Sequence, residues 1–299
     1  MAKIIVTGGA GFIGSNLVDA LIEKGHEVLI IDNLSTGKKE NINPKAKFFE
    51  ADVRNFKEIR PLFEGVDFVF HEAALARIPL SIEKPIETND INIKGTLNVL
   101  VASKEAGVKK LIYASSSSVL GSKAELPMKE DMPCQPLNPY ALQKYVGEIY
   151  CKIFFDIYKL PTVVLRYFNV YGPRQPKEGT YVPVIGIFLT QKAKGKPLTV
   201  TGDGEQTRDF THVFDVVRAN ILAMGSDKVG KGEVINIGAN QNHSINKIAE
   251  IIGGKINYIP QLPGEMRDTL ADITRAKELL GWEPKIKLEE GIKKLLENE

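Results

Sequence analysis

The chain has 299 residues, of which 43% are hydrophobic and 25% are charged, a composition typical of a globular protein with a full core. Its 39 Lys and Arg residues nearly balance its 37 Asp and Glu residues, so the formal net charge is only +2 and binding to nucleic acid through bulk charge is not expected. No apolar run reaches the roughly 18 residues of a membrane span, so no membrane partner is expected either.

The first two thirds of the chain alternate strand-like and helix-like segments. Apolar and β-branched runs predict strands at residues 3–7, 27–32, 45–51, 67–71, 110–114 and 162–167. Helical patterns fall at residues 16–24, 55–63, 86–106 and 138–158. This alternation predicts the α/β class, with a Rossmann-type doubly wound parallel sheet and helices on both of its faces.

The second part of the chain has shorter elements, and Pro and Gly become frequent after Gly172. We expect helices at residues 184–194, 215–224, 244–252, 273–280 and 288–296, and a strand at residues 233–237. The sequence therefore predicts a larger Rossmann-type domain over residues 1–171, to which residues 211–237 return. A smaller C-terminal α/β domain is expected over residues 172–299.

A glycine-rich turn at residues 8–14 joins the first predicted strand to the first helix in the pattern Gly-x-x-Gly-x-x-Gly. Glycines allow the backbone to approach a pyrophosphate, and the helix N-terminus that follows favours an anion. Asp32 ends the second strand, where a carboxylate can accept both ribose hydroxyls of NAD and repel the 2′-phosphate of NADP. Lys38 and Lys39 lie close by and would favour NADP, but we predict NAD. The alternative is a plain glycine-rich turn with a surface aspartate.

Tyr140 and Lys144 lie four residues apart on the helix at 138–158, so their side chains share one face. A nearby ammonium favours the phenolate form of tyrosine, whose usual pKa is about 10, and a nicotinium ring would add to that shift. The pair is therefore predicted to act as a general base near neutral pH. Serines at 115–118 follow the strand at 110–114, at the edge of a parallel sheet where ligands bind. Alone, the Tyr-x-x-x-Lys spacing is typical of a helix surface, and a run of four serines is typical of a polar loop.

Taken in this order, the motifs resemble the extended short-chain dehydrogenase/reductase family over nearly the whole chain. More narrowly, the chain resembles the UDP-sugar 4-epimerases, and most of all the branch that acts on UDP-N-acetylhexosamines. The resemblance is carried by residues 7–14, 32–34, 52–53, 71–74, 92–96, 115–121, 138–140 with Lys144, 165–169, 202–204 and 208–210.

The resemblance implies NAD as the cofactor, bound by residues 1–171 with 211–237, and a UDP-sugar as the substrate, a nucleotide-sugar bound mainly by the substrate-binding domain at residues 172–299. It also implies a homodimer as the assembly. The implied catalytic residues are Ser116, Tyr140 and Lys144. The implied NAD contacts are Gly8, Gly11, Phe12, Ile13, Gly14, Asp32, Asn33, Ser35, Thr36, Gly37, Asp52, Val53, Ala73, Ala74, Ala76, Asn92, Tyr140, Lys144, Tyr167 and Phe168. The implied substrate contacts are Ser116, Ser117, Tyr140, Asn169, Val200, Arg208, Arg267 and Thr269.

The sequence departs from the family pattern at two positions. Leu120 stands where a tyrosine is common, and Leu262 stands where some 4-epimerases have a phosphate-binding arginine. The second departure shifts the expected contact with the diphosphate to Arg267. Thr269 aligns with a large tyrosine in members limited to UDP-glucose and UDP-galactose, so we expect the acetylated sugars to be accepted as well.

The residues after Ser116 indicate which reaction to expect. In similar dehydratases an Asp–Glu pair follows the catalytic hydroxyl residue, and UDP-glucuronate decarboxylases usually have a Glu there. This chain has Ser117 and Ser118 instead. The resemblance therefore implies oxidation of the sugar at C4, return of hydride to the opposite face, and inversion of C4.

Two other functions stay open. The first is a UDP-glucuronate 4-epimerase or another sugar-nucleotide oxidoreductase, in which Arg77 would contact a substrate carboxylate rather than face solvent. The second is a protein that senses NAD without catalysis, although such relatives often lose the tyrosine or the lysine. His71 and Glu72 are expected to be packed or hydrogen-bonded rather than catalytic.

Three further expectations concern location, metals and assembly. Cys134 and Cys151 are too few for a disulfide framework, and no secretion signal is expected at the start, which together favour a cytoplasmic protein. The histidines lack the spacing of metal ligands, so no metal site is expected. The helix at 138–158 has apolar residues on more than one face, which predicts a dimer contact with the helix around residues 92–101.

Overall fold

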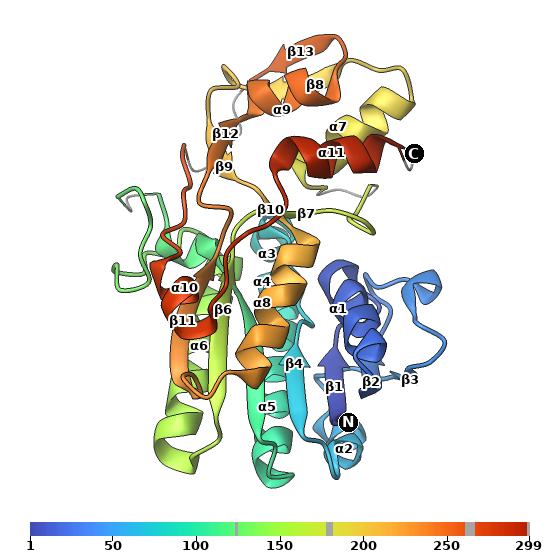
Figure 1. Ribbon diagram of the computed structural model, residues 1–299, viewed down its shortest axis with the longest axis vertical. Helices are drawn as coiled ribbons and strands as arrows, with labels where there is room; N and C mark the ends of the chain where they lie inside the picture. Colours follow the sequence, from blue (N-terminus) through green and yellow to red (C-terminus); the bar gives the residue numbers. More distant parts are fainter. Residues whose placement is uncertain (123–124, 178–181, 261–266, 298–299) are drawn as a thin grey trace.

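A seven-stranded parallel sheet forms the centre of the computed structural model, which describes residues 1–122, 125–177, 182–260 and 267–297 (Figure 1). Its strands follow the order β11-β6-β5-β4-β1-β2-β3. Their bounds are Lys3–Thr7 (β1), Glu27–Asp32 (β2), Lys47–Glu50 (β3), Phe68–His71 (β4), Lys110–Ser116 (β5), Thr162–Tyr167 (β6) and Lys231–Ile237 (β11). The strand order reverses between β1 and β4, so the carboxyl ends of these strands border the crevice where such sheets bind ligands. The predicted fold class is confirmed.

Helices cover both faces of the sheet, because the strand side chains alternate between two apolar clusters. Ile4 and Val6 of β1 belong to one cluster, whereas Ile5 belongs to the other. The first cluster packs under α1 (Phe12–Glu23), α8 (Val213–Gly225) and α10 (Thr274–Leu280), and the second under α5 (Thr96–Glu105) and α6 (Pro139–Tyr158). A sheet buried on both faces explains why its strands read as continuous apolar runs.

The helix expected at residues 86–106 is continuous but not uniform. It begins as α4 (Pro85–Asn89), passes through a π-helical turn at Asp90–Gly95 and ends as α5. Asn92 is buried in this turn, and its carbonyl accepts a hydrogen bond of 2.7 Å from the Thr96 hydroxyl. Two short helices are α2 (Phe56–Ile59) and α3 (Ile78–Glu83). The sequence patterns did not predict α3.

The smaller part of the molecule lies beyond the carboxyl edge of the sheet (Figure 1). Its helices α7 (Val184–Ala193), α9 (Ile245–Ile252) and α11 (Leu288–Glu297) share a third apolar cluster. Three two-stranded sheets accompany them: β10 (Thr211–His212) with β7 (Val170–Tyr171), β12 (Asn242–Ser244) with β9 (Thr207–Asp209), and β13 (Ile256–Ile259) with β8 (Leu198–Thr201). No helix in the described ranges has the length and apolar character that crossing a membrane demands.

Candidate active site

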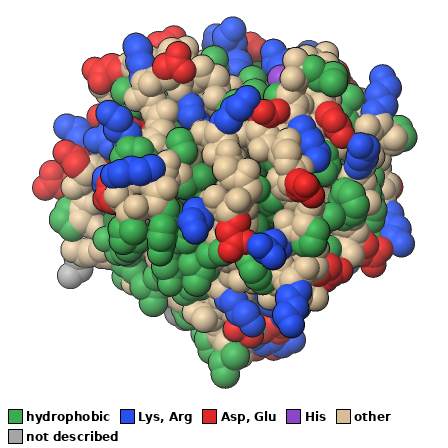
Figure 2. Space-filling model, turned by 90° about the horizontal axis from the view of Figure 1, so that it is seen from below, with side chains coloured by type: hydrophobic (Ala, Val, Ile, Leu, Met, Phe, Trp, Pro, Cys, Tyr) green, Lys and Arg blue, Asp and Glu red, His purple; other side chains and the backbone are tan. Residues whose placement is uncertain are grey.

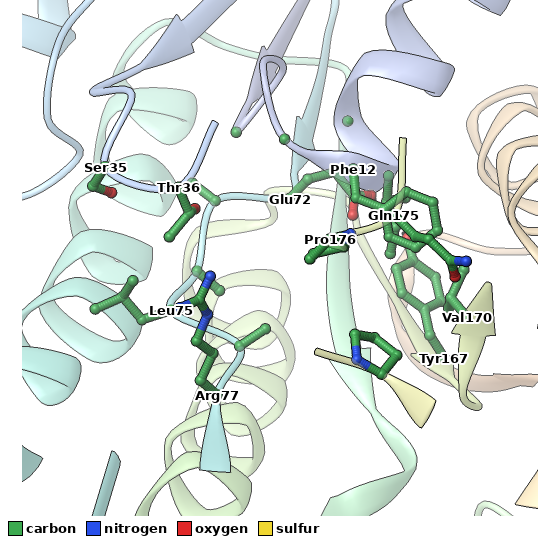
Figure 3. A pocket seen from close by; sticks show the side chains of 18 of the residues that line it. Phe12, Ser35, Thr36, Glu72, Leu75, Arg77, Tyr167, Val170, Gln175 and Pro176 are labelled. Carbon is green, nitrogen blue, oxygen red and sulfur yellow. Dashed lines mark hydrogen bonds between the residues drawn. The ribbon is translucent and has the colours of Figure 1, made fainter. Parts of the chain in front are cut away.

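A cavity of about 1330 Å³ opens at the carboxyl ends of the sheet strands, between the two parts of the molecule. It exceeds the roughly 300–1,000 Å³ of a typical small-ligand pocket, which leaves room for two such ligands side by side. Figure 3 shows Ser35, Thr36 and Leu75 on one side of this cavity and Tyr167, Val170 and Gln175 on the other.

The glycine-rich turn forms one wall of the cavity and leaves no space for side chains. A Cβ atom on Gly8 would lie 2.7 Å from the Ala73 nitrogen, and one on Gly14 would lie 2.2 Å from the Gly8 carbonyl oxygen. Gly8 also has a φ of 72°, which favours glycine. No side chain caps the N-terminus of α1 at Gly11, so its first N–H groups are available to an anion. This wall fits the pyrophosphate of a dinucleotide.

Asp32 lies at the end of β2, where backbone groups orient its carboxylate. One oxygen accepts a hydrogen bond from the Ala10 nitrogen at 3.0 Å, and the other accepts one from the Leu34 nitrogen at 2.8 Å. Burial raises the pKa of this carboxyl above its usual value, and the two hydrogen bonds oppose that effect. A Cβ atom on Gly37 would lie 2.9 Å from both carboxylate oxygens, so the neighbouring loop is packed against them. A carboxylate held in this way suits the ribose hydroxyls of NAD.

Ser116 and Tyr140 both line the cavity, and Lys144 lies on the same face of α6 as Tyr140. Asn138 caps this helix, because its side-chain oxygen accepts a 2.9 Å hydrogen bond from the Ala141 nitrogen. The Lys144 ammonium donates to the carbonyl of Ala114 at 2.7 Å, which ties it to the end of β5. The three residues are therefore placed by two rigid elements, one helix and one strand.

Burial changes the acid–base properties of both Tyr140 and Lys144. Burial raises the pKa of Tyr140 to about 12, and a hydrogen bond with Ser116 acts in the opposite direction. Burial also lowers the pKa of Lys144 to about 8. The phenol is therefore protonated at neutral pH in this structure, because the loss of water outweighs the opposing interaction with Ser116. A further positive charge beside the phenol would be needed to make it a base near neutral pH.

Most of the residues implied by the resemblance line the cavity. These are Gly8, Gly11, Phe12, Ile13, Gly14, Asp32, Asn33, Ser35, Thr36, Asp52, Val53, Ala73, Ala74, Ala76, Ser116, Ser117, Tyr140, Tyr167, Asn169 and Arg208. The cavity wall does not include Gly37, Asn92, Lys144, Phe168, Val200, Arg267 and Thr269.

Two residues of the second group support the wall from behind. The Asn92 amide donates to the Gln143 side chain at 2.7 Å and accepts from the Leu75 nitrogen at 2.8 Å, so it holds the loop that carries Leu75. The Thr269 hydroxyl accepts from the Asp209 nitrogen at 3.1 Å and lies 3.2 Å from the Asn169 amide nitrogen. Phe168 and Val200, in contrast, are completely buried in apolar clusters.

The two arginines expected near a diphosphate lie in different surroundings. Arg208 lines the cavity. Arg267 is exposed and forms two hydrogen bonds, of 2.9 and 3.0 Å, with the carboxylate of Asp203. Leu262 and residues 263–266, on which the expectation about Arg267 partly depends, lie outside the described residues.

The cavity also has wall residues that the sequence did not single out as functional. The segment at 174–177 lines it although it carries no recognisable motif. Glu72 lines it as well, next to His71. His71 is packed as expected, with its ring nitrogens 2.7 Å from the Thr7 hydroxyl and 2.9 Å from the Thr96 hydroxyl. Across the described part of the chain, no cluster of His, Cys, Asp and Glu residues could hold a metal ion.

Comparison with known proteins agrees with this geometry. The model of the NAD dependent epimerase/dehydratase family matches residues 4–238. The structure is similar to that of UDP-glucose 4-epimerase from Thermotoga maritima with UDP-glucose, with a TM-score of 0.95 and 42% identity over 99% of this chain and 97% of that one. It is also similar to UDP-N-acetylglucosamine 4-epimerase from Methanobrevibacter ruminantium in complex with UDP-N-acetylmuramic acid (TM-score 0.93, 38% identity, 100% and 99% covered).

A third similar structure contains both ligands of interest. It is UDP-glucuronic acid 4-epimerase from Bacillus cereus in complex with UDP-glucuronic acid and NAD. The TM-score is 0.89 and the identity 36%, over 97% of this chain and 96% of that one. All three proteins are named as 4-epimerases of UDP-sugars, and their names differ in the sugar.

Proposed function

Because this chain belongs to the NAD-dependent epimerase/dehydratase family, we propose that it is an enzyme that inverts C4 of UDP-sugars with bound NAD. One observation carries the proposal most strongly. Ser116 and Tyr140 line the same cavity as a glycine cradle suited to a dinucleotide. The arrangement can therefore hold a sugar hydroxyl next to a hydride acceptor.

In the proposed reaction, Ser116 orients the C4 hydroxyl of the sugar and the Tyr140 oxygen takes its proton. NAD, when bound, supplies the hydride acceptor, the hydride donor for the return step and a positive charge near the phenol. That charge and the Lys144 ammonium both favour the phenolate and oppose the burial that raises the pKa of Tyr140 to about 12. The 4-keto sugar then turns within the cavity, and Tyr140 returns the proton as C4 is reduced from its other face.

The serines after Ser116 support epimerisation over loss of water or carbon dioxide. Ser117 and Ser118 stand where the similar dehydratases have an acidic pair, and the Ser118 hydroxyl donates to Ser116 at 2.9 Å. A hydroxyl whose proton is already engaged in this way is a poor acid for expelling a leaving group. The simplest outcome of oxidation at C4 is then reduction at C4.

We propose that the substrates are UDP-glucose and UDP-galactose together with their N-acetylated counterparts. Asn169, Arg208 and Thr269 would serve the nucleotide-sugar, Thr269 by supporting Asn169 and by leaving the space that a tyrosine would fill. Incubation with UDP-galactose, UDP-GalNAc and UDP-glucuronate, followed by separation of the epimers, tests this proposal. We expect UDP-galactose and UDP-GalNAc to be converted. If none of the three UDP-sugars is converted, the proposed function is contradicted.

A second candidate substrate is UDP-glucuronate, because Arg77 lines the cavity. Within the described residues its guanidinium makes no hydrogen bond or ion pair, so it is available to an anionic group of a ligand. If Arg77 binds a uronate carboxylate, Arg77→Met will raise the KM for UDP-glucuronate and leave that for UDP-galactose unchanged. Equal effects on both substrates would exclude this contact.

We also propose that the enzyme is a homodimer that pairs through α6. Hydrophobic side chains crowd one side of the face shown in Figure 2. Large apolar side chains are exposed along α6 at Leu142, Ile149, Ile153, Ile157 and Tyr158. Exposed apolar patches of this kind mark interaction sites. If α5 and α6 of each copy pack together across a two-fold axis, these side chains become buried. Light scattering at micromolar concentration should give a dimer, and Ile153→Asp should give a monomer.

The division of labour along the chain is part of the same proposal. Residues 1–171 together with 211–237 would hold NAD, and residues 172–299 would hold most of the nucleotide-sugar. β11 pairs with β6 in the main sheet, which supports the assignment of residues 211–237 to the NAD-binding part. The cytoplasmic location stays a prediction.

A further inference from the structure

The segment that follows β7 lines the cavity, but the proposed reaction gives it no task. Residues 174–177 belong to the cavity wall, and Figure 3 shows Gln175 and Pro176 on this wall together with Phe12 of α1. The chain enters the segment through a tight turn, in which the Gln175 nitrogen donates to the carbonyl of Gly172 at 3.2 Å. What holds this turn in place therefore bears on the shape of the cavity.

Arg174 has an unusual backbone conformation in this turn. Its φ is 67°, in the left-handed region that favours glycine. It follows Pro173 at the third position of the turn, where a positive φ is usually supplied by glycine or asparagine. A strained residue of this kind persists only when the surrounding contacts over-determine it. The contacts of the Arg174 side chain are therefore the place to look for its role.

Two side chains of α1 attach this turn to the sheet part of the molecule. The Arg174 guanidinium forms an ion pair of 2.7 Å with the Asp19 carboxylate. Nearly one helical turn earlier, the Asn16 amide donates to the carbonyl of Pro173 at 3.1 Å and to that of Phe12 at 2.8 Å. Asn16 is buried, so its amide is shielded from competing water. Two successive residues of the turn are thus bonded to the helix whose N-terminus is the anion site.

The other carboxylate oxygen of Asp19 holds a second segment of the cavity wall. It accepts a hydrogen bond of 2.7 Å from the Asn43 amide, in the loop after β2. The Lys38 nitrogen and the Asn41 amide of the same loop both donate to the carbonyl of Ala10 at 3.0 Å, next to the glycine cradle. Lys38 and Asn41 line the cavity. One carboxylate therefore joins α1 to two separate wall segments.

Asp19 does this from outside the cavity. Among the described residues, the cavity wall includes Gly14 and Arg174 but not Asp19 or Asn43. Any effect of Asp19 on a ligand must therefore pass through the two segments that it holds. Because about a third of each side chain is exposed, the ion pair with Arg174 is weak when taken alone. It acts together with the bond to Asn43 on the same carboxylate.

We propose that Asp19 is a positioning residue that retains NAD: its carboxylate keeps the Arg174 turn and the loop after β2 in place beside the glycine cradle, and this slows the departure of NAD. A cofactor that is regenerated within the site has to stay bound through many turnovers, so slow release is an advantage for such an enzyme. The inference goes beyond the proposed reaction, because it needs NAD to bind but does not depend on which sugar reacts.

The rate of NAD dissociation tests this inference without any sugar. The protein is loaded with labelled NAD and mixed with an excess of unlabelled NAD, and the label that stays on the protein is followed over time. Asp19→Ala removes both links and should raise the dissociation rate by roughly three- to thirtyfold. Asn43→Ala removes one link and should raise the rate by a smaller factor. An unchanged rate in Asp19→Ala, even with a lower midpoint of thermal unfolding, overturns the proposal.

A matched control and a double-mutant cycle keep the test decisive. Glu105→Ala removes an ion pair of 2.6 Å with Arg60, and neither residue belongs to the described cavity wall. It should leave the dissociation rate unchanged, and a rise equal to that in Asp19→Ala would contradict a specific role of Asp19. Arg174→Gly suits the φ of the turn but breaks the ion pair. Its effect and that of Asp19→Ala should be less than additive, whereas additive effects would refute the link between the two residues.

The same measurements separate this inference from the proposed function. Faster release of NAD in Asp19→Ala, with no turnover of any UDP-sugar by the wild-type protein, would refute the proposed function and leave the role of Asp19 standing. Turnover of a UDP-sugar, with equal release rates in the wild type and in Asp19→Ala, would refute the role of Asp19 and leave the proposed function standing.

Discussion

Replacement of Gly14 by alanine should empty the enzyme of its cofactor. The added Cβ atom would lie 2.2 Å from the Gly8 carbonyl oxygen and 2.9 Å from the Gly8 carbonyl carbon, and both are backbone atoms. Ordinary contacts begin at 3.4 Å, so the glycine turn and the start of α1 have to separate by about 1 Å or more. Backbone N–H groups that bind the pyrophosphate then lose their alignment.

The size of the effect follows from the hydrogen bonds lost. Two bonds to a charged group at roughly 1.5–3 kcal/mol each amount to about 3–6 kcal/mol, or about two to four orders of magnitude in the Kd for NAD. The assay is the nucleotide released when the purified protein is denatured. Gly225→Ala is the matched control, because its Cβ atom meets nothing within 4 Å at the exposed end of α8. Full NAD content in Gly14→Ala would refute this account of the cradle.

Three further predictions concern the base, the cofactor and the sugar. Tyr140→Phe should keep the fold and bound NAD but lose about 10²- to 10⁴-fold in kcat, and a wild-type rate would exclude Tyr140 as the base. The protein as purified should contain NAD rather than NADP, because Asp32 repels a 2′-phosphate; NADP as the main species would contradict that assignment. Thr269→Tyr should abolish turnover of UDP-GalNAc while sparing UDP-galactose, and equal loss on both would mean that Thr269 does not limit sugar size.

The main sheet could be predicted from the sequence because each buried strand is a short apolar run between clear turns. The strands at 3–7, 27–32 and 162–167 have the predicted bounds. The first helix was predicted to begin at residue 16, because glycine has a low helix propensity. In the structure it begins at Phe12, inside the glycine motif. The π-helical turn at Asp90–Gly95 could not be predicted, since a single turn of this kind leaves the helical pattern of the sequence almost unchanged.

The strands β7 to β10, β12 and β13 escaped prediction for a different reason. They have two to four residues each, and they pair with segments far away in the sequence. Patterns as short as these do not rise above the alternation found in loops. The helix α3 was missed because six residues span fewer than two turns, too short for a periodic signal.

The candidate site shows the same limit. Motifs pointed to Ser116 and Tyr140, which the fold brings together although they lie on different elements. The sequence did not indicate that burial would raise the pKa of Tyr140, because burial is a property of the whole fold. Glu72 was expected to be packed or hydrogen-bonded; it is hydrogen-bonded, but it also lines the cavity. A carboxylate directly after a buried strand was the only signal for it.

The fate of the hydrogen at C4 tests the central claim most directly. If the sugar is oxidised at C4 and reduced on its other face within one binding event, the hydrogen that leaves C4 returns to C4 of the same molecule. UDP-galactose labelled with deuterium at C4 should then give UDP-glucose that retains the label, in ordinary water and without added NAD. Loss of the label to solvent, or a requirement for added NAD in every turnover, would contradict the account.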